Sequence, residues 1–294
     1  MSRRCLNFLL APLLLLLSPA GAKPLPALQV MTYNLRYASP VPPQAWPERR
    51  PRMAEVIRRV GPDVIGTQEG VYSQLRDLEA DLPGYRWIGL GREGGSRGEF
   101  MAVYYRAERL EPVAFDHFWL SDTPQLIGSA TWGNRFQRMV TWVRFRDRAA
   151  AREFEVWNTH FDHEVEEARL RSAALLRERL AEVDPNLPVI LLGDFNAPAP
   201  ASAVHQRLVA DGFLRDAWAA AAERAGEGLG TFNGFERPDG GPARIDWILW
   251  RGALDPERAE IVADRPDQVY PSDHYPVSVR FRWRELAAPP ADAP

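Results

Sequence analysis

Polar side chains that could do chemistry follow directly after short apolar runs at four places in this sequence. These places are Met31-Thr32-Tyr33-Asn34, Gly66-Thr67-Gln68-Glu69, Trp157-Asn158-Thr159-His160 and Leu192-Gly193-Asp194-Phe195-Asn196. Such runs are typical of buried strands, and the ends of neighbouring strands lie along a common rim of a sheet, where binding sites form. We therefore expect these side chains to converge on a single site.

The candidate ligands in this group all offer oxygen: Asn34, Glu69, Asp194, Asn196 and, further along the chain, Asp273. Hard oxygen donors suit Mg²⁺ or Mn²⁺, which keep several waters and bind phosphate oxygens. The chain has one cysteine, so a cysteine-ligated metal site is excluded and zinc is disfavoured. The predicted cofactor is Mg²⁺, with Mn²⁺ as the alternative.

Two segments supply histidines that titrate near neutral pH, residues 158–163 and 272–274. Either His160 or His274 could activate a water or protonate a leaving group. A catalytic histidine usually needs a carboxylate to hold its tautomer, and Asp246 is a candidate. The alternative for Asp246 is a structural ion pair with Arg244, and the pattern does not decide between the two.

Hydrophobic periodicity predicts the elements that must position these groups. Helices are expected over 47–60, 71–82, 164–183 and 202–225. Strands are expected over 28–33, 63–66, 85–90, 100–105, 115–120, 139–145, 154–157, 188–192, 243–250 and 277–283. Two helix-containing halves around a strand-rich middle favour two sheets packed face to face with helices outside, an α+β sandwich. No linker divides residues 25–285, so we expect one domain.

The composition sets further limits. The chain has 294 residues, 46% hydrophobic and 26% charged, with a net charge of −3 and no fixed repeat, which excludes disordered, collagen-like and solenoid proteins. The five arginines of the first helix are expected to form a solvated face: Arg49, Arg50, Arg52, Arg58 and Arg59.

Residues 1–22 are predicted to be a secretory signal peptide. Ser2-Arg3-Arg4 give a basic start, Phe8 to Leu17 an apolar run too short to span a bilayer, and Ala20-Gly21-Ala22 a cleavage site. We expect a periplasmic or secreted protein that keeps no stable membrane span after the signal peptide is removed, and we expect it to be a monomer. Without Arg3 and Arg4 the chain has 34 basic and 39 acidic residues, a net charge of −5. This balance disfavours nucleic acid as the partner. Residues 286–294 are expected to be a disordered Pro/Ala tail.

The ordered series of motifs resembles the endonuclease/exonuclease/phosphatase superfamily. The series is Asn34, Gln68-Glu69, Asn158-Thr159-His160, Gly193-Asp194-Phe195-Asn196, Arg244-Ile245-Asp246 and Ser272-Asp273-His274, and it spans about residues 30 to 280. A single Gly-Asp-Phe-Asn is weak evidence, whereas the ordered set is highly specific. The resemblance implies a four-layer α/β/β/α sandwich that hydrolyses phosphoesters with a divalent cation by in-line attack of water.

The same resemblance implies a role for each matched residue. Glu69 is the principal metal ligand, with Asn34 and Asp273 close to the cation. Asp194 positions or deprotonates the attacking water together with His274, and their shares are assigned jointly. The remaining catalytic positions are His160, which contacts the phosphate, Asn196, which helps to hold it, and Asp246, which orients His274.

Shorter stretches resemble an exported bacterial branch of metal-dependent hydrolases. By this resemblance the substrate-binding residues are Asn158, His163, Arg138, Phe232 and Asn233. Phe232 would stack a substrate ring and Asn233 would bind a hydroxyl, with plain anchoring of the loop as the alternative. His163 and the neighbouring Asp162 could instead cap the following helix. The expected substrate is a small phosphorylated metabolite, sugar phosphate or lipid headgroup, and the alternative function is a nuclease acting on DNA or RNA.

Overall fold

Two β-sheets packed face to face form the centre of the molecule. The structure, a computed structural model, describes residues 24–42 and 44–285. The predicted leader, 1–22, and the predicted tail, 286–294, lie outside the described residues. Among the residues that are described, no helix is long and apolar enough to cross a membrane.

The first sheet has seven strands and the second has six. The order in the first is β12 (Glu223–Ala225), β14 (Leu254–Ile261), β15 (Val277–Trp283), β1 (Leu28–Asn34), β2 (Val64–Gln68), β6 (Val103–Arg106) and β4 (Tyr85–Ile88). The order in the second is β11 (Arg215–Asp216), β13 (Arg244–Arg251), β10 (Val189–Ala199), β9 (Arg152–His160), β8 (Met139–Asp147) and β7 (Leu110–Trp119). A short pair, β3 (Gly70–Val71) and β5 (Glu99–Phe100), lies apart from both sheets.

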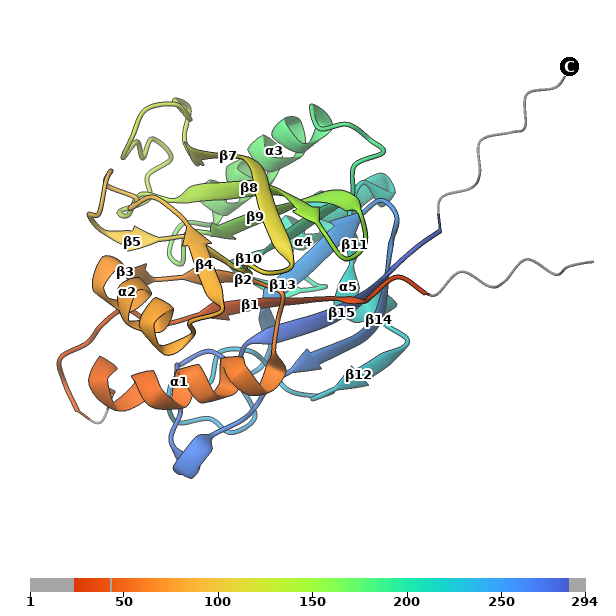
Figure 1. Ribbon diagram of the computed structural model, residues 1–294. Coiled ribbons are helices and arrows are strands. Elements are labelled where there is room, and N and C mark those ends of the chain that lie inside the picture. The colour runs from red at the N-terminus through yellow and green to blue at the C-terminus, as the bar shows by residue number, and fades with distance from the viewer. Residues whose placement is uncertain (1–23, 43, 286–294) are drawn as a thin grey trace, which may run out of the picture.

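Helices cover the outer faces of both sheets (Figure 1). Helices α1 (Trp46–Val60) and α2 (Tyr72–Asp81) pack on the first sheet, and α3 (Glu166–Ala181) and α4 (Ala203–Val209) pack on the second. The short α5 (Ala217–Ala220) and two 3₁₀ turns, Ala210–Gly212 and Pro266–Gln268, complete the elements. The predicted four-layer sandwich is therefore the observed fold.

Alternation of side chains along the strands builds the layers. In β10, Ile190 and Leu192 face the other sheet, whereas Val189 and Leu191 face the helices. In β1, Val30 faces inward in the same way. Both faces of these central strands are covered, which explains why β10 reads as a continuous apolar run.

The predicted helix over 202–225 is wrong. The segment forms α4, a 3₁₀ turn, β11, α5 and β12 instead. Asp211 and Gly212 adopt the left-handed conformation, which ends the first helix, and the Asp216 side chain caps α5 by accepting the backbone N–H of Trp218. The alanines of this segment favour helix locally, but pairing with β13 and β14 overrides that preference.

Arg49 also departs from expectation, because it is fully buried instead of solvated. Its guanidinium donates hydrogen bonds to the carbonyls of Leu35 and Pro271, both at 2.8 Å, and to those of Gln44, Arg36 and Tyr37. These carbonyls lie in the loop after β1 and in the segment before Ser272. One buried cation therefore ties together two loops that carry candidate site residues.

A buried ion pair next to α4 gives a prediction about stability. Burial alone would raise the pKa of Asp216, but bonds from His205 (3.0 Å) and Arg244 (2.5 Å) outweigh burial and hold this pKa below its usual value. Asp216→Asn should lower the free energy of unfolding by about 3 kcal/mol at pH 7, since it leaves the Arg244 charge buried without its partner. A carboxylate with a depressed pKa stabilises the fold above its unfolded pKa of about 3.9 and loses that effect as the pH falls through the folded value.

The difference in stability should therefore shrink as the pH falls below about 4 and vanish once the pH has passed the depressed folded pKa of Asp216. Urea unfolding at pH 7 and at lower pH measures this difference, and Asp211→Asn, at a side chain that is 93% exposed, is the control. Equal stability of Asp216→Asn and the unmodified protein at pH 7 would contradict the prediction.

Candidate active site

The candidate site lies where the inner, apolar layer between the sheets turns polar. Along β10 the inward-facing series Ile190, Leu192 continues to Asp194. Strand register places Asp194 beside His160 of β9 and beside Asp246 of β13. Gly193 permits this close pairing, because a Cβ there would stand 2.0 Å from the Thr159 carbonyl oxygen. Three predicted residues thus form one row across three strands.

A chain of side chains joins Asp246, His274 and Asp194. His274 Nδ1 lies 2.9 Å from Asp246 Oδ2, and His274 Nε2 lies 3.7 Å from Asp194 Oδ2. Because a carboxylate only accepts, Nδ1 carries a proton and the ring presents Nε2 to Asp194. Asp246 therefore pairs with His274, and Arg244 pairs with Asp216.

Burial and neighbouring charges shift the pKa values of both Asp194 and His274. Burial raises the pKa of Asp194 to about 7, and the Asp246 charge adds to the rise, while His274 opposes it. Burial acts to lower the pKa of His274, but the Asp246 and Asp194 carboxylates outweigh it and raise this pKa well above its usual value. The pair can hold and exchange one proton next to a bound substrate.

The imidazole of His160 lies next to Asn196 and Asp194. The amide Nδ2 of Asn196 donates to the Phe161 carbonyl and lies 3.1 Å from His160 Nε2. The same Nε2 lies 3.5 Å from Asp194 Oδ2, whereas Nδ1 is buried without a partner among the described residues. Burial and the Arg138 charge lower the pKa of His160 well below its usual value. Nε2 is therefore the ring nitrogen that stands beside Asp194 and Asn196.

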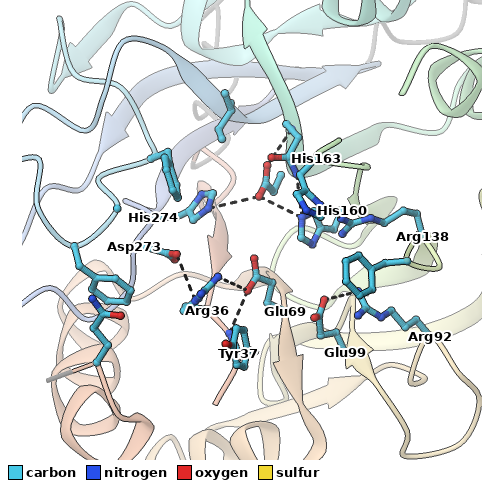
Figure 2. Close-up of a pocket in the computed structure, with 18 residues that line it drawn as sticks. Arg36, Tyr37, Glu69, Arg92, Glu99, Arg138, His160, His163, Asp273 and His274 are labelled. Atoms are coloured by element: carbon cyan, nitrogen blue, oxygen red, sulfur yellow. Dashed lines mark hydrogen bonds and ion pairs between the residues drawn. The ribbon is translucent and has the colours of Figure 1, made fainter. Parts of the chain in front are cut away.

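The carboxylates of Glu69 and Asp273 lie on either side of one positively charged side chain, the guanidinium of Arg36. The guanidinium of Arg36 lies 3.7 Å from Glu69 Oε2 and 3.5 Å from Asp273 Oδ2 (Figure 2). Burial raises the pKa of Asp273 and the Glu69 charge adds to it, against the charges of His274 and Arg36. Two carboxylates that compete for positive charge, with no nitrogen or sulfur donor between them, fit Mg²⁺ or Mn²⁺.

Asn34, predicted as a metal ligand, makes three hydrogen bonds between the two halves of the site. Its Oδ1 accepts the backbone N–H of Arg36, and its Nδ2 donates to Glu69 Oε1 and Asp194 Oδ2, both at 3.0 Å. The amide oxygen accepts within the protein here, and the role of Asn34 as a metal ligand stays a prediction. In this arrangement Asn34 connects the two halves of the site as a donor.

Backbone strain concentrates at this site. Eight non-glycine residues have a positive φ among the described residues, and four of them line the cavity: Arg36, Glu69, Asn196 and Phe235. Each costs about 1 kcal/mol or more, and such residues persist where the surrounding structure holds them. The turn at Glu69 lets this carboxylate leave the strand direction at the end of β2 and reach Asn34.

Arg138 and His163, next to strands β8 and β9 of the second sheet, complete the opposite wall. Arg138, just before β8, donates from Nη2 to His163 Nδ1 at 2.8 Å, and both residues line the cavity. Asp162 instead accepts the backbone N–H groups of Glu164 and Val165. Helix α3 begins at Glu166 after Val165 and has no side-chain cap, so Asp162 holds the turn before the helix and does not cap it. His163 lines the cavity.

In the loop 231–235, Phe232 lines the cavity, whereas Asn233 is buried behind it. Phe232 is 45% exposed, lines the cavity and packs edge-to-face on His274 with ring centroids 5.1 Å apart. Asn233 is fully buried, donating to the Ser272 carbonyl and accepting the backbone N–H of Phe235. The predicted contact of Asn233 with substrate is wrong, because its amide is satisfied within the protein and holds the loop against 272–274.

Asn158 is likewise not a wall of the cavity. Its Nδ2 donates to the carbonyls of Thr67 and Ala102, and its Oδ1 accepts Gln68 Nε2 at 2.7 Å. It sits one inward-facing position before His160 and joins the two sheets beneath the site. The predicted contact with substrate is replaced by a positioning role.

The cavity contains residues that the sequence patterns did not single out. Its volume is about 550 Å³, which suits a small metabolite, and its wall includes Arg36, Tyr37, Gln44, Arg92, Glu99 and Phe136. Arg92 is the second residue of the glycine-rich loop 91–98, and Glu99 follows the loop directly. Their side chains form an ion pair with an N–O distance of 2.6 Å. Opposite charges at the two ends of a glycine-rich loop were the one local signal for this pair.

Comparison with known proteins bears on this arrangement. The sequence matches the Endonuclease/Exonuclease/phosphatase family over residues 31–274, which takes in every motif position from Asn34 to His274. The chain belongs to this family. Its members include hydrolases that act on phosphoesters, and the predicted fold and family assignment are thereby confirmed.

Two solved structures from Bacteroides thetaiotaomicron are each 34% identical to this chain with a TM-score of 0.82. One is an endonuclease/exonuclease/phosphatase family protein, with 88% of this chain and 98% of that chain covered. The other is a mannosyl-6-phosphatase, with 87% and 100% covered.

Two further matches are to a less similar structure and to a curated relative that aligns with about half of this chain. D. rerio TDP2, complexed with single strand DNA product, is 15% identical with a TM-score of 0.67, covering 87% of this chain and 99% of that chain, and shares the fold. An uncharacterized protein of Acanthamoeba polyphaga mimivirus is 31% identical over 160 residues, which are 51% of this chain. The match spans 59% of the length of this curated relative.

Proposed function

We propose that this protein is a divalent-cation-dependent phosphoester hydrolase that acts on a small phosphorylated substrate such as a sugar phosphate. The observation that carries the proposal is the Asp194–His274–Asp246 chain, which faces the Glu69–Asp273 carboxylate pair across one cavity. The likeness to a mannosyl-6-phosphatase over nearly the whole chain favours a small ester over nucleic acid.

The side chains divide the chemistry of hydrolysis. Asp194 accepts a hydrogen bond from the attacking water and draws its proton, while His274, held by Asp246, supplies positive charge and a proton from Nε2 to the leaving oxygen. His160, whose Nε2 lies beside Asp194 and Asn196, contacts a phosphoryl oxygen through that nitrogen. Glu69 and Asp273 would hold the cation, which supplies charge neutralisation for the phosphoryl oxygens when bound.

Metal dependence gives the direct test. The purified protein should release phosphate from a panel of esters that includes mannose 6-phosphate when Mg²⁺ or Mn²⁺ is present, and release none in EDTA. Glu69→Gln should raise the Mg²⁺ concentration for half-maximal rate by about tenfold or more, because it removes one of two charges facing the cation. Glu111→Gln, on the exposed edge of β7, is the matched control and should behave like the unmodified protein.

Failure to release phosphate from every ester in the panel, with metal present, would overturn the proposal. The same assays should include plasmid and single-stranded DNA. Metal-dependent degradation of DNA without ester hydrolysis would replace this function with a nuclease.

A further inference from the structure

Two buried guanidinium groups stand at one end of the cavity. Arg138 is 3% exposed and Arg92 is 7% exposed, yet both line the cavity wall. Figure 2 shows them together on one side, with His274 and Asp273 on the other side and Glu69 between the two groups. The cavity therefore has an acidic, reactive end and a basic end.

The internal partners of these guanidiniums leave donors unused. Arg92 Nη1 donates to Glu99 Oε2 at 2.6 Å, and Arg138 donates to Asp162 at 3.4 Å and to His163 Nδ1 at 2.8 Å. Arg92 Nε and Arg138 Nη1 are buried without a hydrogen-bond partner among the described residues. Each carboxylate holds its arginine in place but cannot serve all five N–H groups of the fork.

Burying the Arg92 and Arg138 guanidiniums near each other costs free energy in the protein without a ligand. A buried N–H group without an acceptor costs free energy, and two like charges close together add to that cost. Burial lowers the pKa of Arg92 and the Arg138 charge lowers it further, while the Glu99 carboxylate acts against both. An oxyanion between them would accept the unused N–H groups and relieve the repulsion.

The reacting phosphoryl group has other partners. It must reach Asp194, which handles the water, and the Glu69–Asp273 pair. Arg92 and Arg138 pair with Glu99 and Asp162 instead, and after burial their charges also lower the pKa of the neighbouring His160. The cavity volume of about 550 Å³ leaves room for a substrate that extends from one end to the other.

We propose that Arg92 and Arg138, with the imidazole of His163, form a second anion-binding subsite, and that the substrate carries a second oxyanion besides the phosphoryl group that is cleaved. This inference rests on the proposed function for its link to catalysis. The subsite takes a phosphate or a carboxylate, which share the acceptor geometry that the guanidinium fork binds. Phe136, stacked against His163 and next to Arg92, forms the apolar side of this subsite.

Binding of inorganic phosphate tests the subsite without any catalysis. In EDTA the acidic end repels phosphate, so the metal-free protein should bind it at the basic end. Isothermal calorimetry should show that Arg138→Gln and Arg92→Gln each weaken binding by about tenfold or more. Arg138→Lys and Arg92→Lys keep the charge and lose the fork, so intermediate affinities are expected and guard against a folding defect in the Gln variants.

Arg135→Gln is the matched control, because this exposed arginine stacks on Phe136 without lining the cavity. Its affinity for phosphate should equal that of the unmodified protein. No phosphate binding by the unmodified protein, or an equal loss in Arg135→Gln, would overturn the subsite whatever the enzyme hydrolyses.

Hydrolysis of paired esters tests the link to substrate choice. The unmodified enzyme should have a kcat/KM for fructose 1,6-bisphosphate about tenfold or more above that for fructose 6-phosphate. Arg138→Gln should lower the bisphosphate value by about tenfold more than the monophosphate value. An equal fall for both esters would overturn the inference, since it would assign the guanidiniums to the scissile phosphate. If no ester is hydrolysed at all, the proposed function fails, and phosphate binding alone decides whether the subsite exists.

Discussion

Replacing Asp194 with Asn is expected to lower kcat for ester hydrolysis by about 10³-fold or more. The amide cannot draw a proton from water, and it removes the negative charge that faces His274 Nε2 at 3.7 Å. Oδ1 of the new side chain can still accept the backbone N–H of Asn196, so the turn after β10 should survive. Steady-state kinetics with saturating Mg²⁺ measure the loss as a fall in kcat.

The other oxygen of Asp194 accepts Nδ2 of Asn34, and an amide nitrogen there would face a second donor. Rates should therefore be compared well below the melting temperature of each protein, measured by circular dichroism. Asp211→Asn, at an exposed 3₁₀ turn, controls for the loss of one acidic charge. A fall in kcat of less than about tenfold would remove Asp194 from water activation and leave His274 as the base.

Asp246→Asn is the second variant with a large expected effect, and it acts through His274. The carboxylate accepts the Nδ1 proton at 2.9 Å, whereas an amide can present Nδ2 and favour the opposite ring tautomer. The loss in kcat should be about 10³- to 10⁴-fold, the size seen when a histidine loses its orienting aspartate. Asp246 is thus a positioning residue whose effect passes through the imidazole.

Two measurements separate this role from a structural one. The Asp246 charge raises the pKa of His274, so this pKa, followed by NMR of the ring protons, should fall in Asp246→Asn. The double variant Asp246→Asn/His274→Ala should be no slower than His274→Ala alone, because both changes remove one function. Additive losses would contradict this account, and Asp255→Asn on the exposed face of β14 is the control.

Local sequence patterns predicted most elements that position the site. Alternation and apolar runs located the central strands, and the amphipathic helix at 164–183 appears as α3, Glu166–Ala181. These predictions succeed because burial of one or both faces imposes a period on the residues themselves. The failure at 202–225 has the converse cause, because strand pairing with distant residues overrode the helix preference of its alanines.

The site shows the same division between local and distant causes. The sequence predicts chemistry that depends on residue type alone. Examples are the oxygen ligands Glu69 and Asp273 and the two histidines. The roles of Asn34, Asn158 and Asn233 cannot be predicted in this way, because an amide can bind a ligand or satisfy buried carbonyls, and only its surroundings decide which.

By itself the sequence determined the layered fold, the family and the set of side chains that gather at the rim, since period-two burial and ordered motifs are properties of the chain. The tertiary structure alone decided that Arg49 is buried beneath the site loops and that Arg92 stands beside Arg138. Arginines look alike in a sequence whether they are solvated or enclosed. What distinguishes them is the number of acceptors that the folded chain brings to each guanidinium, and those acceptors come from segments far apart in the sequence.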